Sequence, residues 1–90
     1  MPEIYDTTAR DAQRAVRVLR LDLIEAIAHR LERYPLRQGE LAELLGIARP
    51  RLNRLLKREV ELFSLDALAA IAVRAGLAVK LGATRPYGGR

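Results

Sequence analysis

The chain has 90 residues, half of them hydrophobic and 30% charged, which suits one compact domain and is too short for two. It contains no cysteine, which excludes disulfides and thiolate chemistry, and with a single histidine a histidine-based metal site is not expected. No apolar run approaches the ~18 residues that cross a membrane, and residues 1–10 lack the order of a signal peptide. We therefore expect a cytoplasmic protein without a membrane partner and, because so short a chain has a thin core, a homodimer.

The longest predicted element is a helix that begins after a Thr7–Thr8 N-cap and runs to Tyr34, where Pro35 ends it. The three- and four-residue spacing of its apolar side chains predicts one face packed in the core. That face comprises Val16, Leu19, Leu23, Ile27 and Leu31, with Ile24, Ala28 and Tyr34 on its flank. The polar N-terminal third lies outside this pattern, so residues 1–14 are predicted to be flexible or frayed.

Two short helices are predicted next, over residues 38–45 and from Arg49 to about Arg58. Gly46 ends the first of them, and Pro50 is tolerated in the first turn of the second because that turn needs no N–H donor there.

The last predicted helix is capped by Ser64, runs to Ala75 and is stopped by Gly76 at the C′ position. The following Leu77–Leu81 is the one strand candidate, since its side chains alternate. Leu77, Val79 and Leu81 share one face, and we expect them to form a dimer interface by pairing with the same strand of a second copy.

The positive charge of the chain is concentrated in one segment. The formal net charge is +5, and residues 1–34 carry six basic and six acidic side chains, whereas residues 35–58 carry six basic and two acidic ones. Five basic residues and no acidic one lie between Gly46 and Arg58. Such a cluster is typical of a surface that binds a polyanion.

The same segment has the spacing of a helix-turn-helix. Ala42 is the small residue where the two helices cross, and Gly46 tolerates the positive φ of the turn. The docking positions are apolar: Leu41, Leu45, Ile47, Leu52 and Leu55. The chain is therefore predicted to be all-α, with four main helices, a central helix-turn-helix and one C-terminal β-strand that pairs across the dimer.

A helix-turn-helix places the exposed side of its second helix in the major groove of double-stranded DNA. Arg49, Asn53 and Arg54 are the candidates for base edges, since arginine suits guanine and asparagine suits adenine. Lys57, Arg58 and Arg51 are the candidates for phosphate, together with Arg37 and Gln38 at the start of the first helix.

The run LRQGELAELLGIARPRLNRLLK, followed by FSLDAL, RAGL and a short strand, resembles the XRE/Cro-type helix-turn-helix proteins, of lambda-repressor-like fold, and their HigA-like antitoxin branch. The resemblance implies a transcriptional repressor that binds a near-palindromic operator, controls its own operon as one half of a type II toxin-antitoxin pair, and neutralises a RelE-like toxin. Two positions depart from the family pattern: Arg37 replaces the usual threonine, and Ala48 replaces the usual capping serine or threonine.

Two alternatives remain open: a stand-alone XRE-type regulator without a toxin, and a protein-interaction module on a helix-turn-helix scaffold. An enzyme is not expected, and neither is a cofactor or a metal, because no paired carboxylates, glycine-rich phosphate loop or metal-ligand spacing occur. The predicted domains are the segment 1–14, the DNA-binding and dimerisation domain 15–82 and a flexible tail 83–90.

Overall fold

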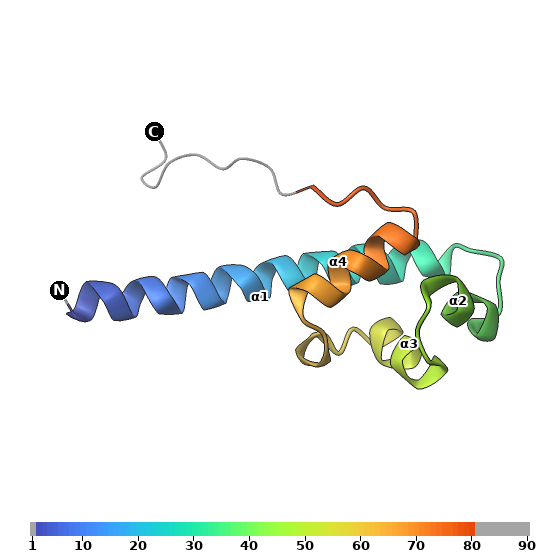
Figure 1. Ribbon diagram of the computed structural model, residues 1–90, viewed down its shortest axis with the longest axis horizontal. Coiled ribbons are helices and arrows are strands. Elements are labelled where there is room, and N and C mark those ends of the chain that lie inside the picture. Colours follow the sequence, from blue (N-terminus) through green and yellow to red (C-terminus); the bar gives the residue numbers. More distant parts are fainter. Residues whose placement is uncertain (1, 81–90) are drawn as a thin grey trace.

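The computed structural model describes the backbone of residues 2–80 and the side chains of residues 9–80. In this part of the chain the elements are α1 (Pro2–Glu32), α2 (Gln38–Leu45), α3 (Arg49–Leu56), the short 3-10 helix η1 (Val60–Leu62) and α4 (Leu65–Arg74). Helix α4 lies along the second half of α1, and α2 and α3 lie near the C-terminal end of α1 (Figure 1). The first half of α1 projects beyond the other helices. The all-α prediction is confirmed.

The start of α1 differs from the prediction, because the helix begins at Pro2 instead of after a Thr7–Thr8 cap. Residues 3–32 contain neither proline nor glycine, and a proline at the first helical position loses no hydrogen bond. Nothing in the sequence therefore interrupts the helix at Thr7. At the other end, the N–H groups of Arg33 and Tyr34 close the last turn on the carbonyls of Arg30 and Leu31.

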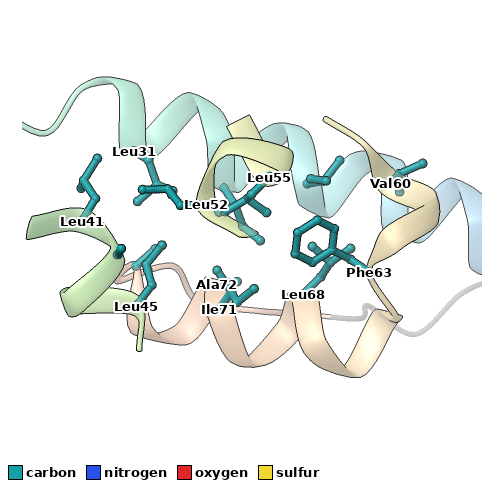
Figure 2. Packing of buried hydrophobic residues seen from close by; sticks show 14 residues of the cluster. Leu31, Leu41, Leu45, Leu52, Leu55, Val60, Phe63, Leu68, Ile71 and Ala72 are labelled. Atoms are coloured by element: carbon teal, nitrogen blue, oxygen red, sulfur yellow. The ribbon is translucent and has the colours of Figure 1, made fainter. Parts of the chain in front are cut away.

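The core lies where α1, α3 and α4 meet, and Figure 2 shows apolar side chains from all four α-helices pointing into it. Ile24, Ile27, Ala28 and Leu31 are the buried residues of α1. Ile24 and Ala28, predicted for the flank, are thus central, whereas Val16, predicted for the core, is 41% exposed. The reason is the projection of α1, which places Val16 where no large apolar neighbour covers it.

The helix-turn-helix has the predicted bounds. Gly46 adopts φ 68° and donates its N–H to the carbonyl of Glu43, while Ile47 donates to Ala42. Helix α3 begins at Arg49 as predicted but ends at Leu56, slightly earlier than expected. The N-cap residue, Ala48, makes no side-chain hydrogen bond to the helix, because its methyl group has no acceptor.

Both ends of α4 match the predicted signals. The Ser64 hydroxyl accepts a hydrogen bond of 3.1 Å from the N–H of Ala67. At the C-terminal end, Arg30 Nε and the Tyr34 hydroxyl each donate to the Ala75 carbonyl at 2.6 Å. Gly76 follows with φ 85°. These two donors satisfy an otherwise free helix-end carbonyl and join the ends of α1 and α4.

The C-terminal strand is not shown by the structure. Residues 77–80 have no regular secondary structure, and Leu81 and the predicted tail 83–90 lie outside the described residues. A strand is defined by its pairing, and residues 2–80 contain no second strand with which 77–80 could pair. The dimer strand therefore stays a prediction. Within the described residues, no helix is both long and apolar enough to cross a membrane.

We predict that Gly76→Ala lowers the free energy of unfolding by about 1–2 kcal/mol. Its φ of 85° strains any residue with a Cβ, and that Cβ would lie 2.9 Å from Arg30 Nη2. The matched control is Gly39→Ala in the first turn of α2, where the nearest atom would be 4.0 Å away. Urea unfolding should show an unchanged or slightly raised stability for this control. Equal effects of the two substitutions would contradict the explanation.

Candidate nucleic-acid interface

The exposed side of α3 forms a continuous polar face. Leu52 and Leu55 are fully buried, so they turn the opposite side of the helix toward solvent. The exposed residues on that side are Arg49, Pro50, Asn53 and Arg54, and Lys57 continues it just past the helix end. We call these five residues the basic face. It contains three cations and no acidic residue.

The basic face adjoins the first turn of α2. Arg37 and Gln38 are exposed there, and the Arg49 guanidinium comes so close that a Cβ on Gly39 would lie 4.0 Å from its Nη1. The Glu40 carboxylate caps the start of α2, where it accepts a 2.9 Å hydrogen bond from the Arg37 N–H. The structure thus brings Arg37, Gln38 and Arg49 into one region at the start of the two helices.

Arg51 lies apart from the basic face. It is half-buried, and its guanidinium carbon sits 4.4 Å from the centroid of the Phe63 ring, as a cation–π contact. Phe63 itself is 1% exposed, so Arg51 covers the edge of the core. One signal in the sequence could have indicated this position. Arg51 precedes the buried Leu55 by four residues, so both side chains lie on the same side of α3.

Arg58 is also engaged within the chain. Its guanidinium donates to Glu32 Oε2 at 2.8 Å and to Glu25 Oε2 at 2.9 Å, which ties the end of α3 to α1. These hydrogen bonds and the positive charge of Arg58 lower the pKa of both carboxyl groups. The same hydrogen bonds and the two negative charges raise the pKa of Arg58. The residue adopts φ 59°, an uncommon conformation for a side chain other than glycine. Contact of Arg51 and Arg58 with DNA stays a prediction, and the structure gives both a role in positioning α3.

Sequence reasoning missed one further basic residue. Arg74 at the end of α4 is exposed, and its guanidinium covers Gly46 in the turn between α2 and α3. No spacing in the sequence relates positions 46 and 74, so only the packing of α4 could bring them together. Among the side chains of residues 9–80, no group of acidic or histidine residues is arranged to hold a metal ion.

We predict that the Arg58 cluster makes stability depend on acid pH. Because the pKa values of Glu25 and Glu32 are lowered in the folded chain, their ion pairs stabilise it above the ordinary value of 4.5 and are lost as the pH falls through the lowered values. Arg58→Gln should therefore flatten the decline in unfolding free energy between about pH 5 and about pH 3. The control Arg54→Gln, on the basic face, should leave the pH dependence of the unfolding free energy unchanged. If both variants show the same pH dependence, the Arg58 cluster is not its cause.

The comparisons with known proteins agree with this geometry. Residues 6–84 match the family described as a helix-turn-helix domain, and this range includes every element from α2 to α4. A search of the curated proteins finds no match. The family match extends over most of the chain and coincides with the turn at Gly46 and the exposed basic face. The chain therefore belongs to the helix-turn-helix domain family and is a helix-turn-helix DNA-binding protein.

Proposed function

We propose that this protein is a dimeric, sequence-specific transcriptional repressor that controls its own operon and requires no catalytic step. The observation that carries the proposal is the basic face of α3, which is exposed while the leucines behind it hold the helix in the core. A helix presented in this way fits the major groove, where base edges differ between the four base pairs.

The exposed residues divide by their chemistry. Arg49, Asn53 and Arg54 have the donors and acceptors that read base edges. Lys57, Arg37 and Gln38 contact phosphate, because they lie toward the two ends of the helix-turn-helix. We leave Arg51 and Arg58 out of the proposed contact set because their guanidinium groups already bind Phe63 and two carboxylates.

The proposed dimer uses the segment after α4. Val79 is 43% exposed and lines an apolar groove between α1 and α4, whereas Leu77 already packs against its own core. Pairing of residues 77–81 with those of a second copy would supply partners for their backbone groups and cover Val79. A two-fold axis there would space the recognition helices by ~34 Å, which predicts half-sites ~10 base pairs apart.

We further propose that the protein is the antitoxin of a type II pair and neutralises a RelE-like toxin. The support is the resemblance of FSLDAL and RAGL to the HigA-like branch, together with the exposed residues 9–18 of α1, whose arginines have no DNA-binding role in the proposal. A stand-alone regulator is the alternative. An interaction module that lacks DNA affinity is disfavoured by the exposed basic face.

We predict that binding to DNA from upstream of its own gene depends strongly on salt. With two to four phosphate contacts per subunit, log affinity should fall against log salt with a slope of about −4 to −7. Arg54→Ala should cost ~1–3 kcal/mol on this DNA and much less on random DNA, whereas Lys57→Ala should weaken both alike. Fluorescence anisotropy titrations of the parent and of both variants on the two DNAs measure these six affinities. A slope near zero would exclude DNA binding, and equal behaviour of the variants would refute the assigned roles.

We predict that Val79→Asp yields a monomer in sedimentation velocity and reduces affinity for the full operator about a hundredfold, since the two half-sites no longer act jointly. Val73→Asp is the matched control because Val73 is 63% exposed and lies outside the strand. A dimeric Val79→Asp protein that binds as tightly as the parent would show that residues 77–81 are not the interface.

We predict that the full chain captures the product of the adjacent gene, and that removal of residues 1–14 or 83–90 abolishes capture. The first segment includes residues 9–14 of α1, which are exposed, and the second lies outside the described residues. Pull-down of the two co-expressed proteins, with DNA binding of each truncation as the control for folding, tests this expectation. Capture that survives both truncations would place the toxin-binding surface elsewhere, and no capture by the full chain would favour the stand-alone regulator.

A further inference from the structure

One member of the basic face has no charge and no part in the contacts proposed above. Pro50 is exposed in the first turn of α3, and its side chain has neither a hydrogen-bond donor nor an acceptor. The other four members of the basic face are all polar: Arg49, Asn53, Arg54 and Lys57. The presence of an apolar ring among them is therefore not explained by attraction to a polyanion.

Pro50 points more directly away from the core than its polar neighbours Asn53 and Arg54. Successive residues of an α-helix turn by about 100°, so Pro50 lies about 170° around α3 from the midpoint between the buried Leu52 and Leu55. The same count places Asn53 and Arg54 at about 130° from that midpoint, one on each side of Pro50. Because residues three and four positions apart are neighbours on a helix surface, these three side chains form one patch.

The position of Pro50 along the helix matters as well as its direction. A recognition helix brings its N-terminal residues closest to the base edges, and Pro50 is the second residue of α3. The major groove offers one apolar substituent, the C5-methyl group of thymine. The groups that identify adenine, guanine and cytosine there are hydrogen-bond donors or acceptors, which a proline ring cannot satisfy. The ring of Pro50 thus suits one base and not the other three.

We propose that Pro50 selects thymine by packing its ring against the C5-methyl group of one thymine in each half-site. This assignment rests on the proposed DNA-binding function and adds an apolar contact to the polar ones. Asn53, which suits adenine, and Arg54, which suits guanine, flank Pro50 on the helix surface, so we expect the thymine beside the base pairs that they read. A polar residue in place of Pro50 would leave the methyl group without this contact.

Replacement of thymine by deoxyuridine tests the proposal, because it removes the C5-methyl group and leaves the O4 acceptor and the base pairing unchanged. Selection from random duplex DNA supplies the binding sequence, and each thymine of one half-site is then replaced in turn. One replacement should weaken binding of the parent about three- to tenfold, which is the effect of losing one buried methyl contact. Pro50→Ser should bind the thymine and deoxyuridine forms of that site equally in fluorescence anisotropy titrations, since a hydroxyl replaces the apolar ring.

Two further variants separate this contact from the part that a proline plays in starting a helix. A proline in the first turn loses no hydrogen bond, and this benefit is the same on every DNA sequence. Pro50→Val keeps an apolar side chain of similar size and should keep the sensitivity to deoxyuridine. Pro35→Ser is the matched control because Pro35 is exposed between α1 and α2, outside the basic face, and it should respond as the parent does. Circular dichroism checks that all variants keep their helix content.

Each result decides the question. Sensitivity to deoxyuridine in every chain except Pro50→Ser supports the selection of thymine by Pro50. An equal response of the parent and Pro50→Ser at every thymine overturns it, and so does loss of the sensitivity in Pro50→Val together with Pro50→Ser. In these two cases the protein still binds DNA, so the proposed function stands. Failure of the parent to enrich any sequence from the random pool overturns the proposed sequence-specific function, and the role of Pro50 with it.

Discussion

The burial of Leu52 and Leu55 between α1 and α4 is the constraint on which the presentation of α3 depends. A helix of eight residues is not stable alone, because forming its first turn costs more than its few hydrogen bonds return. Packing of the two leucines supplies the missing stability and also fixes the rotation of the helix about its axis. The side chains on the opposite side, from Arg49 to Lys57, are exposed as a direct consequence.

Arginines of the same segment divide into two groups because of this rotation. Arg49 and Arg54 point away from the core, whereas Arg51 and Arg58 lie at its margin and find partners there. The positive φ of Arg58 costs of order 1–3 kcal/mol. Its hydrogen bonds to Glu25, Glu32 and the Leu56 carbonyl act against that cost. The position of α3 against α1 thus depends on charged groups at the edge of the core as well as on leucines inside it.

Helix α1 serves two purposes along its length. Its second half contributes buried residues to the core. Arg30 and Tyr34 also bind the carbonyl of Ala75, the residue after α4, and residues 78–80 then lie beside α1. Its first half projects beyond the core, and residues 9–18 are exposed there. A single uninterrupted helix therefore connects the packed domain to a surface outside it, and the change from exposed to buried side chains begins at Leu19.

The local signals of the sequence determined the helix-turn-helix. Gly46, the Ser64 cap and Gly76 act through φ and through hydrogen bonds to near neighbours, so the bounds of α2, the start of α3 and both ends of α4 followed from residues a few positions apart. The start of α1 was not determined in this way, because Thr7 and Thr8 can cap a helix but do not prevent an earlier start.

Only the tertiary structure decided which residues far apart in the sequence contact each other. Val16 is exposed because α1 extends past the core, and Arg58 meets Glu25 and Glu32 from positions 33 and 26 residues away. Phe63 under Arg51 and Arg74 over Gly46 are likewise contacts between distant positions. A sequence pattern records which side chains share one face of a helix. Which other helix meets that face depends on how all the elements pack together, and that is a property of the whole fold.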